Sequence, residues 1–382
     1  MQLKIRHTLV LSALLAVQAA AEDYVNVQFM GYDEESGETT VYTPAIEINK
    51  DFGADYTLNL TLTHDSVSGA SPTWYDTFSG ASAKLPEGVV YKNDITYGPV
   101  EYEDKRKAVG LTLTKRFASR DELTAGVNYS DEYDYTSKEF SLEYLHYLDA
   151  SKNRSITAGA SYQNNDVSVY CSLGNDVCDG VSGASAVVKD LEVVSSEVGF
   201  TQIVDKTSLV KTSLFYIHEN GYLSNPYMRV VRYYDTEPKI TEEQKPGSRT
   251  AYGVTLNYTK ALREDLSSIT DYRFYDDDWD ITSHTLATEL NYEVNPKLSV
   301  GAGVRYYTQT KAKFYSGSKA YFTDQKYASS DRRMADFDAW TYKANASYKV
   351  TSKIQLSGNV AYYDQPDRYN AIFYGVGVKY LF

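Results

Sequence analysis

Much of the chain alternates between apolar and small polar positions with a period of two. The clearest stretch is residues 252–258, where Tyr, Val, Leu and Tyr alternate with Gly, Thr and Asn. Residues 56–64 and 339–350 repeat the pattern. A period of two is typical of β-strands with one apolar and one polar face, so the pattern predicts a chain built of strands.

The connections between these segments are of two kinds. Seven are short and turn-like, near residues 51–53, 119–120, 151–153, 205–206, 263–264, 295–296 and 352–353. The alternate connections vary in length: 66–100, 164–188, 221–248 and 311–338 are long, whereas 33–38, 131–135, 276–280 and 364–368 are brief and acidic. Short turns at one end and variable loops at the other are typical of outer-membrane barrels, and a soluble sandwich has no reason to sort its loops in this way.

Counting strand pairs predicts about 16 strands, in a range of about 14 to 18, from Tyr24 to Phe382. An even number places both chain ends in the periplasm. The weakest hairpin is the first, because Pro44 interrupts residues 41–49. We therefore expect an all-β fold, a single antiparallel transmembrane β-barrel domain over residues 22–382.

Both ends of the chain carry export signals. Residues 1–21 read as a secretory signal peptide, with a basic start, a short apolar core and three alanines at the cleavage site. At the other end the chain stops on Phe382, with Tyr380 two residues earlier and Gly377 further back. This ending resembles the C-terminal sorting signal of bacterial outer-membrane barrels, which implies contact with the barrel assembly machinery. An edge strand of a sandwich is the alternative.

Composition narrows the class of protein. The chain has 37 Tyr against 13 Phe and a mean hydropathy of -0.45, as expected when only every second strand residue faces lipid. Its net charge is -13, and removal of Lys4 and Arg6 with the signal peptide gives -13 - 2 = -15. We therefore do not expect the protein to bind nucleic acid. An acidic exterior suits divalent cations that bridge to lipopolysaccharide, cation-selective permeation, or plain solvation.

The two cysteines, Cys171 and Cys178, lie six residues apart within a predicted loop. In an exported protein this spacing favours a disulfide that closes a loop hairpin. A metal site would need more ligands than the neighbouring residues supply.

Four blocks of sequence resemble one bacterial outer-membrane family. They are residues 271–279 with 283–285 and 289–292, residues 304–309 with 312–315, residues 329–337, and residues 65–72. The family is catalogued as domain of unknown function 3570. The resemblance implies a porin-like β-barrel in the outer membrane and brings no activity, and the acidic run at residues 276–280 departs from the family pattern.

If the apolar positions face lipid, their neighbours face the lumen. Five charged residues then share one wall: Asp271, Arg273, Glu289, Arg305 and Lys343. We expect them to form a charged lumen ladder that sets solute preference. The alternative is a salt-bridge network that stiffens the wall.

A loop triplet could add a constriction. Asp331, Arg332 and Arg333 lie within the long connection 311–338, where the two arginines could fold into the lumen or bind an anionic group. In the alternative the loop caps the barrel and the arginines pair with Asp324, Asp336 or Asp338.

The sequence gives weaker support for a metal site and for a hydrolytic site. Asp276, Asp277, Asp278 and Asp280 gather carboxylates in one turn, which suits calcium, although the spacing is not that of an EF-hand and a solvated turn is the default.

The mature chain also has four histidines, His64, His146, His218 and His284, each near a strand end on the lipid side. No Gly-x-Ser-x-Gly motif and no serine, asparagine or aspartate partner at matching depth accompanies them, so a hydrolase is the least favoured class.

The function that the sequence favours is a porin-like outer-membrane channel for small hydrophilic solutes or ions. A loop-plugged barrel that serves periplasmic or surface partner proteins is the rival, and an outer-membrane hydrolase is third. No cofactor is expected, and the oligomeric state stays open.

Overall fold

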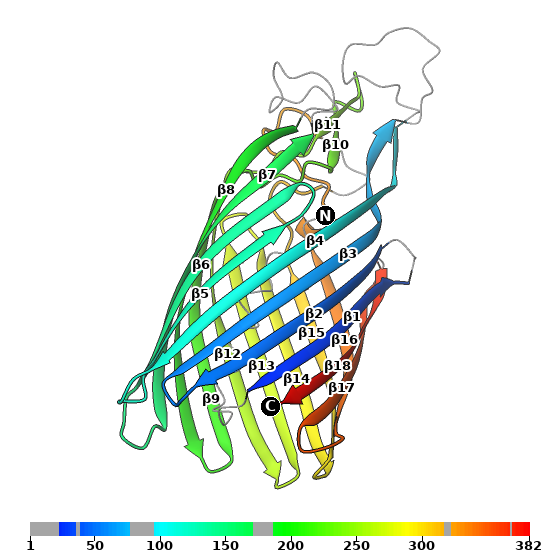
Figure 1. Ribbon diagram of the computed structural model, residues 1–382. Helices are drawn as coiled ribbons and strands as arrows, with labels where there is room; N and C mark the ends of the chain where they lie inside the picture. Colours follow the sequence, from blue (N-terminus) through cyan, green and yellow to red (C-terminus); the bar gives the residue numbers. More distant parts are fainter. Residues whose placement is uncertain (1–22, 36–38, 77–94, 171–185, 317–321, 367–368) are drawn as a thin grey trace.

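The computed structural model describes residues 23–35, 39–76, 95–170, 186–316, 322–366 and 369–382 (Figure 1). Sixteen strands close into one antiparallel barrel, and two short strands form a separate sheet. This confirms the predicted fold class. Within the described ranges, no helix is long and apolar enough to cross a membrane.

The barrel strands differ in length from ten to 22 residues. They are β1 (Tyr24–Glu34), β2 (Thr39–Phe52), β3 (Tyr56–Asp76), β4 (Ile95–Arg116), β5 (Glu122–Asp131), β6 (Tyr135–Tyr147), β7 (Arg154–Tyr170), β8 (Ala186–Asp205), β9 (Ser208–Gly221), β12 (Ser248–Arg263), β13 (Leu266–Asp277), β14 (Thr282–Asn295), β15 (Leu298–Gln309), β16 (Phe337–Lys349), β17 (Ile354–Gln365) and β18 (Tyr369–Leu381). The separate sheet pairs β10 (Arg229–Arg232) with β11 (Lys239–Glu242), and η3 (Arg332–Met334) is a short 3-10 helix.

Strands that follow one another in the sequence pair throughout the barrel, except that β9 pairs with β12 and β1 with β18. The closing pair joins Tyr24 to Leu381, at the end of the barrel that carries the short turns. That end lies at the bottom of Figure 1, and β10 and β11 lie at the top. Closure satisfies the backbone of every strand, which a lipid environment requires.

The doubtful first hairpin forms despite its proline. Pro44 lies within β2, opposite Phe29 of β1. On the other side, the ladder between β2 and β3 has no pairs at Thr43 and Pro44 and resumes at Ala45 in the same register. The Thr43 hydroxyl instead donates to the Asp65 carboxylate of β3. One missing N–H therefore interrupts a few ladder bonds without ending the strand.

Two predicted loops are shorter than the sequence indicated. Residues 66–76 and 95–100 belong to β3 and β4, and residues 164–170 and 186–188 belong to β7 and β8. The prediction failed there because residues typical of loops, such as Pro72, Pro99 and Asn164, interrupt the apolar pattern. Backbone pairing continues all the same, since a ladder needs no apolar side chains and only the part of a strand in lipid requires an apolar outer face.

The two faces of each strand differ as the alternation predicts. Large apolar side chains are exposed on the outer face at alternate positions, such as Leu256, Leu286, Val304, Tyr342 and Val376. The intervening positions face the lumen and carry mostly Gly, Ser, Thr, Asn and charged residues. The described strands therefore present an apolar belt to lipid and a polar wall to the lumen.

Candidate functional site in the lumen

Two connections fold together at the end of the barrel opposite the short turns. We call the described residues of 222–247 and 310–336 the plug; they link β9 to β12 and β15 to β16. Their backbones pair directly, since Gln244 and Ala328 exchange hydrogen bonds of 3.0 and 2.8 Å. A second pair of bonds joins Phe322 to the β10 segment, at Val231 O and Tyr233 N.

An apolar cluster fixes the plug to the barrel wall. The plug contributes Leu223, Ala312, Phe314 and Met334, and the wall contributes Tyr135, Val167, Leu191, Val193, Trp279 and Ile281. Trp279, in the turn after β13, packs edge-on against Phe314 with ring centroids 5.0 Å apart. The plug is thus held between β6–β8 and the β13–β14 turn, and it narrows the outer mouth of the lumen.

A buried ion network joins the two halves of the plug. Lys245 Nζ lies 3.1 Å from Glu243 Oε2 and 3.2 Å from Asp331 Oδ2. Arg333 adds a forked contact to Asp331, with its Nε 2.8 Å from Oδ1 and its Nη2 2.6 Å from Oδ2. The side chains of Lys245, Glu243 and Asp331 are 5%, 0% and 2% exposed, so these charges depend on one another rather than on water.

Protonation in this network follows from the same contacts. Burial acts to raise the pKa of the Asp331 carboxyl, but Arg333 and Lys245 outweigh it and hold that pKa below its usual range. Burial also raises the pKa of Glu243, against the pull of Lys245. Asp331 further caps η3 by accepting the Arg333 N–H at 3.0 Å, which explains why the chain turns there.

The triplet Asp331, Arg332 and Arg333 therefore lies in the plug. Arg333 pairs with Asp331 inside the triplet itself, a partner that the sequence reasoning did not consider. Of the acids that it did consider, Asp324 accepts from the Tyr233 hydroxyl and Asp338 from the Tyr306 hydroxyl. Sequence reasoning also missed Glu243 and Lys245, since nothing in the sequence links them to a residue 86 positions further on.

The five ladder residues all occupy lumen-facing positions of β13 to β16. Glu289 and Lys343 form an ion pair across β15, where Gly303 stands between them in the register. A Cβ at Gly303 would lie 2.7 Å from Lys343 Cε, so the glycine leaves the space that this pair occupies. Asn345 Nδ2 also donates to Glu289 at 3.1 Å.

The other three ladder residues are arranged differently. Asp271 accepts a 2.6 Å hydrogen bond from Asn257 on β12. The Arg273 guanidinium lies over the ring of Phe215 at 4.7 Å, and that of Arg305 lies over Tyr307 at 5.2 Å. The ladder is therefore one ion pair, Glu289 with Lys343, together with two arginines that lie over aromatic rings.

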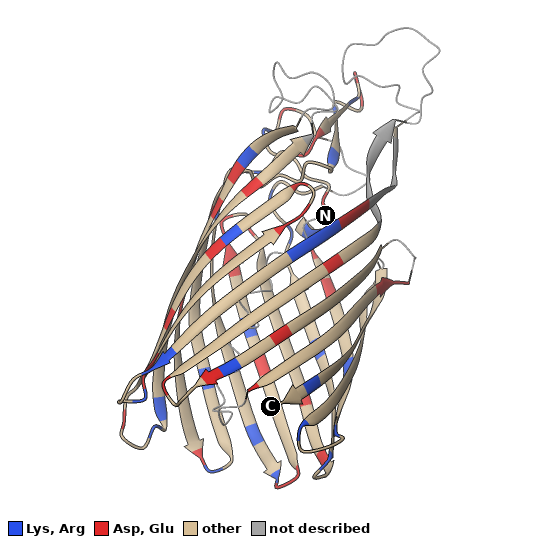
Figure 2. Ribbon diagram, in the orientation of Figure 1, with Lys and Arg blue, Asp and Glu red and all other residues tan. Residues whose placement is uncertain are grey.

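Charged residues occur along most strands of the barrel (Figure 2). Carboxylates prevail among the charged inward positions of the first eight strands: Glu47, Glu122, Glu139, Glu143 and Glu197. On β13 to β18 the inward positions carry both signs: the cations Arg273, Arg305, Lys343, Lys349 and Lys379, and the carboxylates Asp271, Asp277, Glu289 and Glu293. An excess of carboxylates on the first eight strands, opposite a wall of mixed charge, produces a field across the lumen.

Three of the four acids of the β13–β14 turn have separate partners. Asp277 pairs with Arg249 and accepts the backbone N–H groups of Trp279 and Ile281 at 2.9 and 3.0 Å. Asp276 accepts the Thr282 hydroxyl and Asp278 the Thr250 N–H. In the described part of the chain, no three acidic, histidine or cysteine residues are grouped as metal ligands. The carboxylates of Asp276, Asp277 and Asp278 thus fasten the turn.

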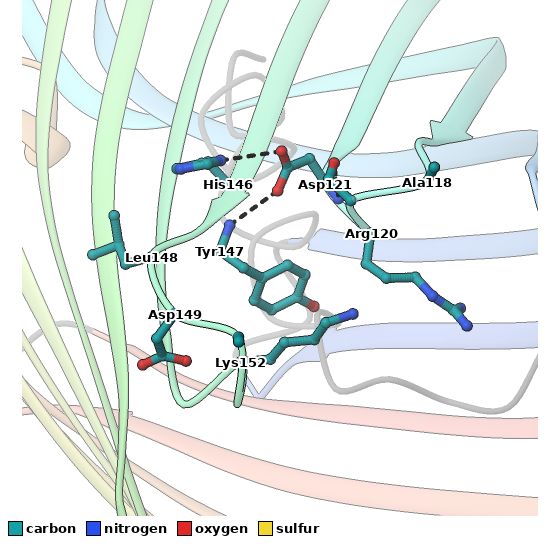
Figure 3. Close-up of a pocket in the computed structure, with 10 residues that line it drawn as sticks. Ala118, Arg120, Asp121, His146, Tyr147, Leu148, Asp149 and Lys152 are labelled. Atoms are coloured by element: carbon teal, nitrogen blue, oxygen red, sulfur yellow. Dashed lines mark hydrogen bonds and ion pairs between the residues drawn. The ribbon is translucent and has the colours of Figure 1, made fainter.

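A cleft of about 560 Å³ opens at the short-turn end, between the β4–β5 and β6–β7 turns (Figure 3). His146 Nδ1 lies 3.1 Å from Asp121 Oδ2, an acid partner that the sequence reasoning failed to find. The backbone N–H of Tyr147, with His146, Ser119 and Tyr144, lowers the pKa of Asp121 to about 2. Here the serine bonds the aspartate, whereas a nucleophile must bond the histidine base. The arrangement therefore ties two turns together.

The terminal strand closes the barrel as its sequence indicates. Gly377 lies next to Ser357 and Gln28, with no room for a larger side chain, and Tyr380 and Phe382 are exposed on the outer face. Phe382 N–H bonds to Asp23 O at 3.1 Å, so the first and last described residues lie side by side. The predicted signal peptide and the predicted Cys171–Cys178 disulfide lie outside the described residues.

Comparison with known proteins places this barrel in a family. A family model described as "Protein of unknown function (DUF3570)" matches residues 5–377, which confirms the resemblance drawn from the four sequence blocks. No curated protein matches the chain.

Solved structures share the fold at low sequence identity. CdiB from Acinetobacter baumannii has a TM-score of 0.52 at 8% identity, over 95% of this chain and 61% of CdiB, so the chain spans less than two thirds of that protein. A bacterial polysaccharide outer membrane secretin has a TM-score of 0.49 at 8% identity, over 95% of this chain and 99% of the secretin. The CymD monoaromatic hydrocarbon channel has a TM-score of 0.45 at 9% identity, over 96% of this chain and 90% of CymD.

Proposed function

The chain belongs to the DUF3570 family of proteins of unknown function, and from this premise we propose that it is an outer-membrane channel for small hydrophilic solutes or ions. The observation that carries the proposal is the polar lumen wall. A 16-strand barrel is wider than its own side chains can fill, so a polar wall of small residues borders water. The Lys343 side chain, in its ion pair with Glu289, is still 40% exposed, as expected beside a water-filled lumen.

The plug supports a restricted rather than a wide channel. Its apolar cluster and buried ion network hold it in the outer mouth, so solutes pass beside it or when it moves. The same observation favours the second candidate, a barrel whose plug blocks the lumen and whose outer surface serves partner proteins. The two differ in whether the folded protein conducts.

We further propose that the chain is not an enzyme, with outer-membrane lipid, lipopolysaccharide and the barrel assembly machinery as its contacts. The His146–Asp121 pair supports this view, because the neighbouring Ser119 bonds the acid rather than the base. The apolar outer belt supports insertion into a membrane.

The test is planar-bilayer conductance of the refolded protein, with ion selectivity from the reversal potential. We expect a stable conductance, and we expect Glu289→Gln to shift the reversal potential toward anion preference because it leaves Lys343 unpaired. Glu293→Gln is the matched control, because it removes the same charge from the same strand at an exposed position near the short-turn end. Silence from protein shown to be folded by heat-modifiable gel migration would instead support the plugged barrel.

A further inference from the structure

Arg305 is a half-buried lumen cation whose donors are not used by the protein. It lies on the inner face of β15, and its guanidinium contacts the Tyr307 ring at 5.2 Å. Among the residues that the structure describes, no carboxylate pairs with Arg305 and no group accepts a hydrogen bond from it. A guanidinium offers five donors in a fixed fork, and one removed from water is usually paired.

The residues on both neighbouring strands beside this arginine are small. The register places Arg305 beside Ala287 of β14 and Thr341 of β16, which are both small. Arg273 lies two strands away, beside Thr285. The two arginines thus stand on either side of β14, whose inward residues between them are only Thr285 and Ala287.

Aromatic rings border the same space. Tyr307 lies beside Thr285 in the register and within electrostatic range of both Arg273 and Arg305. Tyr363 lies beside Thr341, on the other side of Arg305. We call Arg273, Arg305, Tyr307 and Tyr363 the arginine–tyrosine site.

The nearby acids have other partners. Asp271 lies beside Ala287, and its carboxylate accepts the Asn257 amide at 2.6 Å. Glu289, further along β14, forms its ion pair with Lys343. The protein therefore supplies aromatic faces to Arg305 and leaves its charge to be matched by something else.

The site lies directly under the plug. The Tyr307 hydroxyl donates to Gln309 Oε1 at 2.6 Å, and Gln309 Nε2 donates to Arg333 O at 3.0 Å. Any solute that passes the plug on this side meets the arginine–tyrosine site next.

We propose that the arginine–tyrosine site binds a carboxylate carried on a ring, either an aromatic acid or a sugar acid, as it passes through the lumen. A carboxylate matches the guanidinium fork in a two-bond contact. A flat aromatic ring or the C–H face of a sugar packs on tyrosine rings. A role for this site in transport rests on the proposed channel function. Binding of the ring acid can be measured whether or not the protein conducts.

The experiment is isothermal titration of the folded protein in detergent with benzoate and with glucuronate. Acetate supplies the carboxylate without the ring, and benzyl alcohol and glucose supply the rings without the carboxylate. We expect at least one ring acid to bind more tightly than acetate and than its own neutral counterpart. Which of the two binds identifies the solute as an aromatic acid or a sugar acid, and equal or absent binding of all five probes overturns the proposal.

Substitutions assign the binding to Arg305. Arg305→Gln should lower the affinity for the ring acid roughly 10-fold or more, since it removes a charge-assisted two-bond contact. Arg305→Lys keeps the charge but loses the fork, so it should also weaken binding. Lys349→Gln is the matched control, which removes one charge from the same wall at the exposed short-turn end of β16 and should leave binding unchanged. Equal losses in Arg305→Gln and Lys349→Gln would mean that only the general field matters, and would overturn the site.

Conductance separates this inference from the proposed function. If the channel conducts and ring acids block it in brief events that vanish in Arg305→Gln, both stand. A conducting protein with no Arg305-dependent binding overturns the site and leaves the channel. Arg305-dependent binding by a folded protein that does not conduct overturns the channel and leaves the site.

Discussion

Replacing Asp331 by alanine should loosen the plug while the barrel stays closed. Asp331 is the carboxylate shared by Lys245 and Arg333, and it also caps η3. The substitution leaves Lys245 with Glu243 alone and removes the forked contact of Arg333. None of the strand ladders involves Asp331, so the barrel itself has no reason to open.

The size of the effect follows from the burial of the network. The Asp331 side chain is 2% exposed, and removing one partner of a buried ion pair costs about 3 kcal/mol or more. A change of about 3 kcal/mol raises the population of the opened plug roughly 100-fold. The change affects local opening, because the contacts that are lost all lie within the plug.

The assay is hydrogen exchange of the plug amides, read together with conductance. In Asp331→Ala we expect the amides of residues 310–316 and 322–336 to exchange roughly 100-fold faster. We also expect the current recordings to show larger or more frequent channel openings. Asp324→Ala is the matched control, because Asp324 lies in the same connection and makes an exposed hydrogen bond to Tyr233. Heat-modifiable migration checks that both variants are folded. Unchanged exchange in Asp331→Ala, or an equal change in Asp324→Ala, would refute the reasoning.

Two further predictions concern pH and the barrel wall. Burial raises the pKa of Glu242 in β11 to about 7, with Arg229 opposing, so folding binds its proton more tightly. The protonated Glu242 side chain stabilises the β10–β11 hairpin below its ordinary pKa, and this stabilisation is lost as the pH rises through about 7. After correction for the intrinsic effect of pH on exchange, the amides of β10–β11 should therefore exchange faster at about pH 8 than at about pH 5. Glu242→Gln should remove this difference. Gly253→Ala should lower the refolding yield on gels, since its Cβ would lie 2.1 Å from Phe274 O, whereas Gly358→Ala meets only Gly375 O at 3.8 Å and should refold normally. Equal yields would contradict the packing argument.

The sequence predicted the barrel well because its physics is local. Each turn and each alternating segment is visible within about a dozen residues, and neighbouring strands pair in order, so the strand number follows from the turns. The predicted limits of β3, β4, β7 and β8 were wrong where loop-type residues interrupt the apolar pattern, because backbone pairing continues past them.

The candidate site was less visible for the opposite reason. The lumen-facing register of the ladder follows from alternation, but its partners depend on which strands lie side by side and on small residues such as Gly303 between them. The plug depends on contacts that no periodic pattern encodes, such as Lys245 with Asp331, 86 positions apart. Asp121 and His146 were likewise separated by a whole hairpin in the sequence.

The apolar cluster that fixes the plug also bears on the order in which the protein assembles. Leu191 and Val193 of β8 meet Leu223 about 30 residues later in the chain, whereas barrel closure must bring together Tyr24 and Leu381. Loop-closure entropy grows with the length of chain between two contacts, and non-local pairings form late. The contacts of Leu223 with β8 therefore close a much shorter loop, at a lower entropic cost, than the pairing of β1 with β18. The seam between β1 and β18 is therefore the last pairing of the barrel to form.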